Sequence, residues 1–255
     1  PRLALSKTIN KSLSAHFSVS TGYSVPTTLE VRTNEGSLNT ALQPERGINY
    51  ELNVRGGSNQ FSYDLSLFRF DLQESITTFT NPDGVALFRN AGSLKQKGLE
   101  LELLKPWILE KRGVLEKLKS RLSITYHDFQ FNNYETGGED LSGNVLTGTA
   151  PWIIAFSTDA LLSKGFFLNF SYIYTDEIPL NDENTVYADA YQMLFAKLGW
   201  RKSWASFDTA LSFGVDNILN ENYSLGNDLN AFGGRYFQPA PTRNFSIDLI
   251  LTVKR

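Results

Sequence analysis

The chain closes with the sequence GVDNILNENYSLGNDLNAFGGRYFQPAPTRNFSIDLILTVKR at residues 214 to 255, and this stretch decides the fold. Every second residue from Phe245 to Val253 is apolar, whereas Ser246 and Asp248 between them are polar. This period of two is typical of a β-strand with one apolar face. A long polar stretch, rather than a tight turn, precedes the strand. The combination predicts a transmembrane antiparallel β-barrel, in which strands are joined alternately by long loops and short turns.

The composition excludes several other classes of protein. The chain has no Cys, so a disulfide framework and thiol chemistry are both excluded. Its net charge of -3 gives no clustered excess of Lys and Arg of the kind that nucleic-acid-binding proteins carry. No apolar run approaches the roughly 18 to 20 residues of a membrane-spanning helix. We therefore expect an all-β protein that does not bind nucleic acid.

The same alternation recurs along the whole chain. Eleven strands are predicted, at about residues 2–9, 12–23, 45–55, 60–72, 90–104, 117–131, 151–162, 166–175, 188–201, 205–216 and 243–255. In the second of them, the polar face consists mainly of Ser14, His16 and Ser18. Small polar side chains opposite an apolar face suit a wet lumen inside a lipid-facing wall.

The connections between these strands alternate in length. Four are short, near residues 10–11, 55–59, 163–165 and 202–204, and one of intermediate length spans 105–116. Five are long and rich in Asn, Gly, Asp and Thr, at about 25–43, 73–89, 132–149, 176–187 and 217–242. In an antiparallel sheet this places all long loops on one side, as in outer-membrane barrels with long extracellular loops and short periplasmic turns.

The strand count predicts an incomplete barrel. Bacterial single-chain barrels have even strand numbers, because both termini lie on the periplasmic side. Eleven strands therefore lead us to expect that residues 1–255 are part of one larger β-barrel domain, with the other strands outside this chain.

Several stretches, in the right order, resemble the C-terminal half of TonB-dependent outer-membrane receptors. The stretches are Leu42-Gln43-Pro44-Glu45 with Asn49-Tyr50-Glu51-Leu52, Arg89-Asn90-Ala91-Gly92 with Gly98-Leu99-Glu100-Leu101-Glu102, Gly148-Thr149-Ala150-Pro151-Trp152, Val215 to Tyr223, and Gly234-Arg235-Tyr236 with Pro241-Thr242-Arg243-Asn244-Phe245. Together they cover about 210 residues in the order that the family has.

This resemblance implies a 22-stranded barrel in the bacterial outer membrane, plugged by an N-terminal domain. The present chain would be its second half, without the plug. The resemblance also implies uptake of a scarce nutrient, a small-molecule chelate such as an iron-siderophore complex. Its partners would be outer-membrane lipids and, through the plug, the TonB-ExbB-ExbD complex that supplies energy. No cofactor is expected.

Aromatic residues near strand ends have two possible roles. Tyr23, Trp107, Tyr134, Trp152, Tyr174, Tyr187 and Trp204 are expected in the interfacial girdles, where amphipathic rings sit at the depth of the headgroups. On the long-loop side, some residues are instead candidates for binding ligand: Tyr134, Tyr187, Tyr223, Arg235 and Tyr236. Because Arg235 and Tyr236 belong to the motif before the last strand, closure of that loop is the competing role for both.

Charged and polar residues on the inner face are candidates for contact with the plug, namely His16, Glu100, Glu102 and Asp248. Glu100 and Glu102 lie two apart on one strand face, but no base or nucleophile accompanies them, so we predict no catalytic residue. The only histidines, His16 and His127, lie in different strands, and their spacing indicates no set of three or four metal ligands. We therefore predict no metal site.

Two other functions stay open at this stage. One is a glycan or peptide importer of the same barrel type, covered by a surface lipoprotein lid. The other is an unplugged porin or a barrel enzyme, which would conduct ions without TonB or hydrolyse a substrate.

Overall fold

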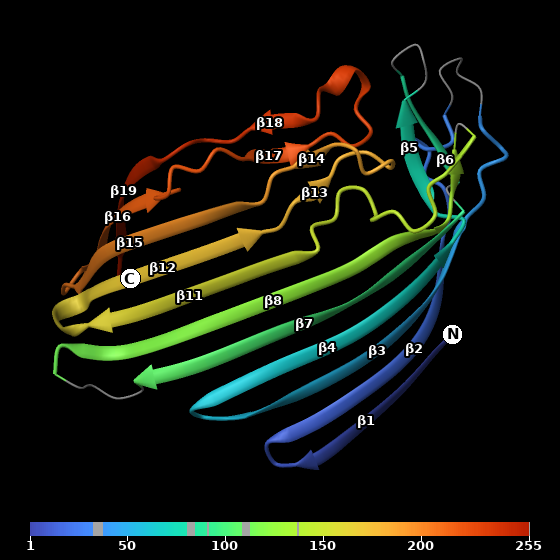
Figure 1. The fold of residues 1–255 in the computed structure, drawn as a ribbon. Coiled ribbons are helices and arrows are strands. Elements are labelled where there is room, and N and C mark those ends of the chain that lie inside the picture. The colour runs from blue at the N-terminus through green and yellow to red at the C-terminus, as the bar shows by residue number, and fades with distance from the viewer. Residues whose placement is uncertain (33–37, 81–84, 91, 109–112, 137, 255) are drawn as a thin grey trace.

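The computed structural model describes residues 1–32, 38–80, 85–90, 92–108, 113–136 and 138–254. Their main feature is one eleven-stranded antiparallel sheet (Figure 1). Its strands are β1 (Arg2–Asn10), β2 (Leu13–Ser24), β3 (Glu45–Ser58), β4 (Phe61–Gln73), β7 (Ser93–Ile108), β8 (Leu115–Asn133), β11 (Trp152–Leu162), β12 (Phe166–Thr175), β15 (Tyr191–Ser203), β16 (Phe207–Asp216) and β19 (Asn244–Val253). The all-β class and the strand count are confirmed.

Each strand pairs with its neighbours in chain order, so the sheet is a simple meander. β1 and β19 form its two edges, and within the described residues the sheet stays open between them. Several predicted boundaries were wrong by a few residues. The strand predicted at 90–104 is β7 (Ser93–Ile108), and the one predicted at 188–201 is β15 (Tyr191–Ser203).

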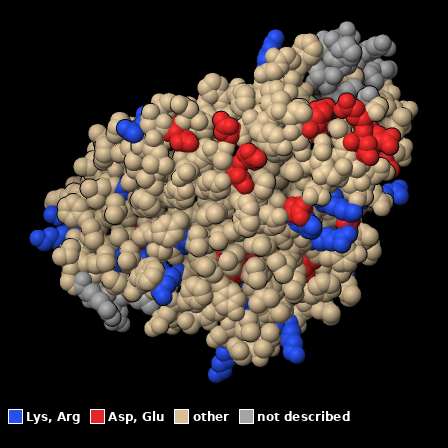
Figure 2. Space-filling model, in the orientation of Figure 1, with Lys and Arg blue, Asp and Glu red and all other residues tan. Residues whose placement is uncertain are grey.

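The two faces of the sheet differ in polarity. On β19 the apolar Ile247 and Val253 are 75% and 76% exposed, while Ser246 and Asp248 on the other face are half-buried. Figure 2 shows few charged side chains across the middle of the face in view, and Lys, Arg, Asp and Glu gather toward the strand ends and the loops. An exposed apolar band bounded by polar ends is the surface that a barrel presents to lipid.

Aromatic side chains mark the edges of this band. Trp107, Trp152 and Trp204 are 57%, 39% and 42% exposed, as a headgroup position requires. Lys202 Nζ lies 4.0 Å from the centre of the Trp204 ring, so a cation accompanies the aromatic ring next to a short turn. Tyr134 was wrongly assigned to a girdle, because only 2% of it is exposed.

The long connections carry short hairpins of their own, which the sequence patterns did not predict. They pair β5 (Ile76–Thr80) with β6 (Ala86–Asn90), β9 (Glu135–Thr136) with β10 (Glu139–Asp140), β13 (Ile178–Pro179) with β14 (Tyr187–Ala188), and β17 (Ser224–Asn227) with β18 (Phe237–Pro239). In Figure 1, β5–β6, β13–β14 and β17–β18 lie at the end of the sheet opposite the short turns.

The most buried apolar cluster lies at this loop end. It consists of Leu94, Phe131, Tyr134 and Leu141, with Leu72 and Leu146 packed against it. The remaining secondary structure is two 3-10 turns, η1 (Ser163–Gly165) and η2 (Phe232–Gly234). Neither helix in the described ranges is long and apolar enough to cross a membrane. Ala91, one of the motif residues, lies outside the described ranges.

Candidate ligand-binding site

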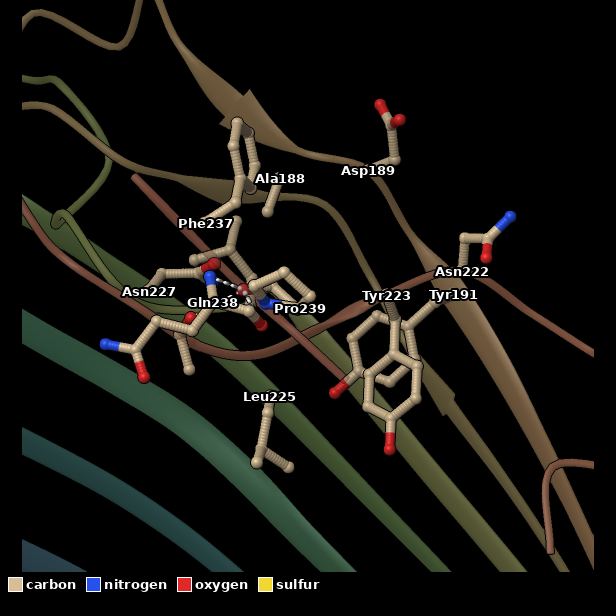
Figure 3. A pocket seen from close by; sticks show the side chains of 13 residues that line it. Ala188, Asp189, Tyr191, Asn222, Tyr223, Leu225, Asn227, Phe237, Gln238 and Pro239 are labelled. Atoms are coloured by element: carbon tan, nitrogen blue, oxygen red, sulfur yellow. Dashed lines mark hydrogen bonds between the residues drawn. The ribbon is translucent and has the colours of Figure 1, made fainter. Parts of the chain in front are cut away.

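A cavity of about 420 Å³ opens between the hairpins β13–β14 and β17–β18, at the loop end of the sheet (Figure 3). Its volume lies within the range usual for small-molecule sites. It is lined by Ile178, Ala188, Asp189, Tyr191, Asn222, Tyr223, Ser224, Leu225, Gly226, Asn227, Phe237, Gln238 and Pro239.

Two stacked tyrosines form part of the cavity wall. Tyr191 begins β15, and Tyr223 immediately precedes β17. Their rings stack with centroids 5.0 Å apart and an interplanar angle of 28°. Tyr191 is paired in register with Thr175 on the inner face of the sheet, so the stack stands at the mouth of the lumen. Neither tyrosine hydroxyl has a hydrogen-bond partner among the described residues, so both are free to bind ligand.

The β17–β18 hairpin holds the polar side of the cavity in place. The backbone nitrogen of Gln238 donates a hydrogen bond of 2.9 Å to Ser224 Oγ, and the side-chain Nε2 of Gln238 donates one of 3.2 Å to Asp228 Oδ1. Asn227 Oδ1 differs, because it is buried and has no hydrogen-bond partner among the described residues. Buried acceptors are nearly always satisfied, so Asn227 leaves one hydrogen bond to be supplied.

The described residues that line the cavity include a single ionised group. Asp189 is exposed at its edge, and none of the described lining residues is Lys, Arg or His. Stacked rings, amide groups and one carboxylate equip the cavity to bind a ligand through ring faces and hydrogen bonds. In the described part of the chain, no group of three or more His, Cys, Asp or Glu is placed to hold a metal ion.

Asp182, a buried carboxylate beside the cavity, connects three of the long connections. It is 5% exposed and accepts hydrogen bonds from Tyr134 Oη at 2.8 Å, Thr147 Oγ1 at 2.6 Å and Asn230 Nδ2 at 3.1 Å. Its amide nitrogen also donates to Asn230 Oδ1 at 3.0 Å. A buried charge is tolerated when it is satisfied in this way. The network fixes the loop after β12 against the loops after β8 and β16.

Tyr134 belongs to this network. Arg89 Nη2 donates to its hydroxyl at 2.6 Å, so the hydroxyl both accepts from Arg89 and donates to Asp182. Burial, followed by the neighbouring Asp182 carboxylate, raises the pKa of Tyr134, and Arg89 opposes the shift. Because the ring is buried and the hydroxyl is engaged by Arg89 and Asp182, Tyr134 offers little surface to a ligand.

The other predicted ligand residues are spread around the cavity. Tyr223 lines it. Tyr187 is 37% exposed and pairs with Pro179 in the β13–β14 hairpin, one residue from the lining Ala188. Arg235 is exposed beside η2, and the half-buried Tyr236 accepts a backbone hydrogen bond from Asp228 at 3.0 Å. Neither is among the lining residues.

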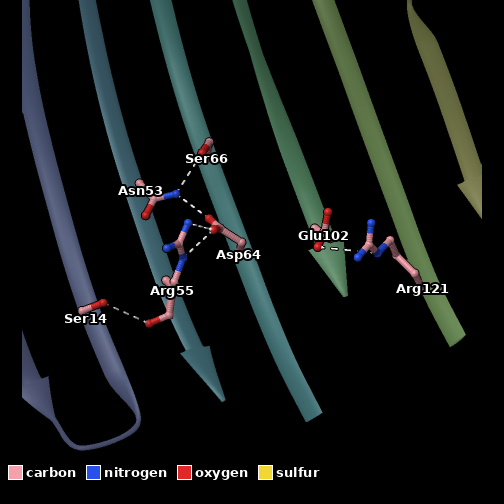
Figure 4. A network of polar contacts seen from close by, with 7 residues as sticks. All are labelled: Ser14, Asn53, Arg55, Asp64, Ser66, Glu102 and Arg121. Atoms are coloured by element: carbon pink, nitrogen blue, oxygen red, sulfur yellow. Dashed lines mark hydrogen bonds and ion pairs between the residues drawn. The ribbon is translucent and has the colours of Figure 1, made fainter. Parts of the chain in front are cut away.

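The predicted inner-face residues find partners within the wall itself. Ser6 Oγ and His16 Nδ1 lie 2.7 Å apart, and Asp248 Oδ2 lies 3.1 Å from Lys197 Nζ. Glu102 pairs with Arg121 at 3.8 Å across β7 and β8 (Figure 4). Glu100 is exposed on the same face. A Lys or Arg of the plug was expected opposite Glu100 and Glu102, and contact of all four residues with the plug stays a prediction; three of the four side chains have a partner on a neighbouring strand.

A second cluster on the inner face joins β3 and β4. Asn53 Nδ2 donates to Asp64 Oδ1 at 2.5 Å and to Ser66 Oγ at 3.0 Å, and Arg55 Nε donates to Asp64 Oδ2 at 2.6 Å (Figure 4). Register pairing places Asn53 beside His16 and Arg55 beside Ser14 on β2. The inner face is therefore a polar, cross-linked surface, as a water-filled or plugged lumen requires.

A family model and several solved structures match most or all of this chain. The family model "TonB dependent receptor-like, beta-barrel" matches residues 1–218. Among solved structures, the ferric yersiniabactin uptake receptor FyuA from Yersinia pestis matches with a TM-score of 0.73 and 17% identity, over 100% of this chain and 37% of its own. The siderophore receptor PiuA from Acinetobacter baumannii matches with a TM-score of 0.74 and 17% identity, over 99% of this chain and 35% of its own. The ferric citrate transporter FecA matches with a TM-score of 0.76 and 14% identity, over 100% of this chain and 38% of its own. At these identities the likeness concerns the fold, and the chain spans less than two fifths of each structure.

Proposed function

The chain belongs to the TonB-dependent receptor-like β-barrel family, whose members lie in the bacterial outer membrane, and from this we propose that it forms wall and loops of a receptor that takes up a ferric siderophore complex. The family is one of transporters and receptors rather than enzymes. The observation that carries the proposal is the cavity with the Tyr191–Tyr223 stack. It stands at the loop end of the sheet, where a ligand arriving from outside the cell would first meet the protein.

The proposed mechanism has two stages. The long connections, held together by Asp182, present the cavity to the outside and bind the chelate. A plug domain in the rest of the protein then rearranges under force from TonB, which works with ExbB and ExbD, and the chelate passes through the lumen. The inner face supports this route, because its charges are paired along the wall, as Arg55–Asp64 and Lys197–Asp248 are.

A glycan or peptide importer with a lipoprotein lid is the second candidate. The specific observation in its favour is the same pair of stacked tyrosines, since flat aromatic faces and amide groups also bind uncharged rings. The receptor would then copurify with a surface lipoprotein and bind an oligosaccharide or peptide. An unplugged porin would instead conduct ions without TonB, and a barrel enzyme would turn over substrate in detergent.

Uptake of radioactive iron tests the proposal. The full-length protein is expressed as the sole receptor of its type in iron-starved cells, which are offered a panel of ferric chelates in the presence and absence of TonB. We expect uptake of at least one chelate only when both the receptor and TonB are present. If the receptor is assembled in the outer membrane and no chelate is taken up, or if uptake persists without TonB, the proposal is wrong.

A further inference from the structure

Two of the long connections at the loop end of the sheet are rich in acidic residues. The connection from residue 176 to 190 contains five carboxylates and no Lys or Arg, and the connection from 134 to 151 contains three carboxylates and no Lys or Arg. Figure 2 shows acidic side chains along the loop side of the molecule. The connection from 217 to 243 is balanced, with Glu221 and Asp228 against Arg235 and Arg243. The connection from 176 to 190, which supplies Ile178, Ala188 and Asp189 to the cavity, is therefore negatively charged.

The interior of the cavity gives an independent indication of the ligand. Among the described lining residues the only ionised group is that of the exposed Asp189, and the other polar side chains carry amides and hydroxyls. Tyr191 and Tyr223 present an aromatic stack, whose negative ring faces attract cations and repel anions. Asn227 Oδ1, buried and without a partner among the described residues, calls for a donor rather than an acceptor.

The carboxylates, the aromatic ring faces and the unpaired acceptor all disfavour a negatively charged ligand. Two charges of equal sign repel each other, and the repulsion is stronger at a partly buried site than in water. A chelate that keeps negative charge would approach several carboxylates and find no described Lys, Arg or His in the cavity to offset them. A chelate without net negative charge meets no such cost.

Resting on the proposed function, we infer that this cavity takes a ferric chelate with no net negative charge, of the hydroxamate type, and disfavours catecholate and polycarboxylate chelates. A set of hydroxamate groups just neutralises the ferric ion, whereas a full set of catecholates leaves excess negative charge on the complex. The hydroxamate ligand also brings methylene chains that can cover the Tyr191–Tyr223 stack, together with amide N–H groups that can donate to Asn227.

Equilibrium binding to the purified full-length receptor tests this inference. Three probes are compared: a neutral ferric trihydroxamate, a ferric trihydroxamate that carries an ammonium group, and a ferric tris-catecholate. We expect the two hydroxamates to bind at least about tenfold more tightly than the catecholate. Tighter binding of the catecholate would overturn the inference and leave the proposed function standing. If none of the three chelates binds although the cells take up another ferric chelate through this receptor, the inference fails alone; if the receptor takes up no ferric chelate at all, the proposed function fails as well.

A charge reversal at the cavity provides the matched variant. Asp189→Lys removes the one carboxylate of the lining, and we expect it to weaken binding of the ammonium-bearing chelate about tenfold while improving catecholate binding. Glu183→Lys is the control, because Glu183 is an exposed carboxylate of the same connection outside the lining. Since both side chains are exposed, neither change should unfold the loop. Equal effects of the two variants on binding would show that the cavity does not discriminate between chelates by their charge.

Discussion

The hydroxyl of Tyr134 donates a 2.8 Å hydrogen bond to the buried carboxylate of Asp182, although the two residues lie 48 positions apart in the chain. This contact joins the connection after β8 to the connection after β12. Asn230 bonds to the same carboxylate and adds the connection after β16. The loops that surround the cavity therefore form one linked unit rather than three independent segments.

Asp182→Ala should release this unit. The change leaves the buried hydroxyl of Tyr134 and the half-buried hydroxyl of Thr147 without their shared acceptor, and an unsatisfied buried group costs about 1–3 kcal/mol. We expect the free energy of local loop opening to fall by at least about 2 kcal/mol, which would speed hydrogen exchange in these loops about thirtyfold. Exchange is measured by mass spectrometry on the assembled receptor. Glu183→Ala, at the exposed neighbouring position, serves as the control, and an equal effect there would contradict the role of Asp182.

Alkaline titration should reveal the environment of Tyr134. Because its pKa is raised in the folded state, the folded loop keeps a proton that the opened loop would release above pH ~10. The stability that Tyr134 contributes should be complete below that pH and should be lost as pH rises through the folded pKa. The difference in tyrosinate absorbance between the natural receptor and Tyr134→Phe isolates this group. A midpoint above about 10 is expected, and a midpoint at or below that value would contradict the assigned burial.

The short turn between β11 and β12 requires glycine at position 165. Gly165 has a φ of 87°, and a Cβ placed there would lie 2.0 Å from the backbone oxygen of Arg201. Gly165→Ala should therefore lower the temperature at which the folded barrel unfolds in detergent, as followed by gel mobility. Gly113→Ala is the matched control, because Gly113 has a φ of 62° but open space around its Cα. For Gly113→Ala we expect a loss of stability of only about 1–2 kcal/mol, because alanine is disfavoured in the left-handed backbone conformation. Unfolding temperatures lowered to the same extent would show that the contact with Arg201 is unimportant.

The faces of β19 should respond differently to charge. Leu249 lies on the apolar face and Ser246 on the polar face. Leu249→Arg places a charge in lipid, which costs roughly 2–4 kcal/mol at the midplane, and should impair assembly of the receptor in the outer membrane. Ser246→Arg places the same charge in the lumen and should assemble nearly normally. Assembly is measured as the folded, heat-modifiable fraction, and equal loss for both variants would refute the assignment of the faces.

The wall was predictable from sequence because its pattern is strong and repeated. Alternation such as Leu99, Leu101 and Leu103 against Glu100 and Glu102 fixes both the strand and the side of the sheet that each residue faces. The alternation of long and short connections then fixes the meander. Strand ends were less predictable, because the outermost pairs of β7 and β8, Ser93 with Asn133 and Ile108 with Leu118, lie next to register shifts that interrupt the alternation.

The loop unit was only partly predictable. Hairpins as short as β13 and β14, with two residues each, leave no periodic signal. Tyr134 follows a strand end, which is also where girdle tyrosines occur, so its burial depends on contacts that form only when distant loops meet. Asp182 sits in an Asn- and Asp-rich stretch that resembles any polar turn. Of the residues that line the cavity, Tyr223 was among the ligand candidates because of its place in a long loop. Tyr191 was missed because it lies in a predicted strand, and Phe237 was missed because the β17–β18 hairpin left no periodic signal.

The measurement that tests the account most directly is cysteine labelling in intact cells. The 255 residues contain no cysteine, so single substitutions in them are unambiguous. Leu225→Cys lies in the cavity wall and is well exposed, whereas Ser206→Cys lies in the short turn between β15 and β16. With a membrane-impermeant maleimide applied to the full-length receptor, we predict labelling at position 225 that a ferric trihydroxamate blocks. Position 206 should be labelled only after the outer membrane is permeabilised. Labelling of 206 in intact cells, or labelling of 225 that no ferric chelate slows, would contradict the account.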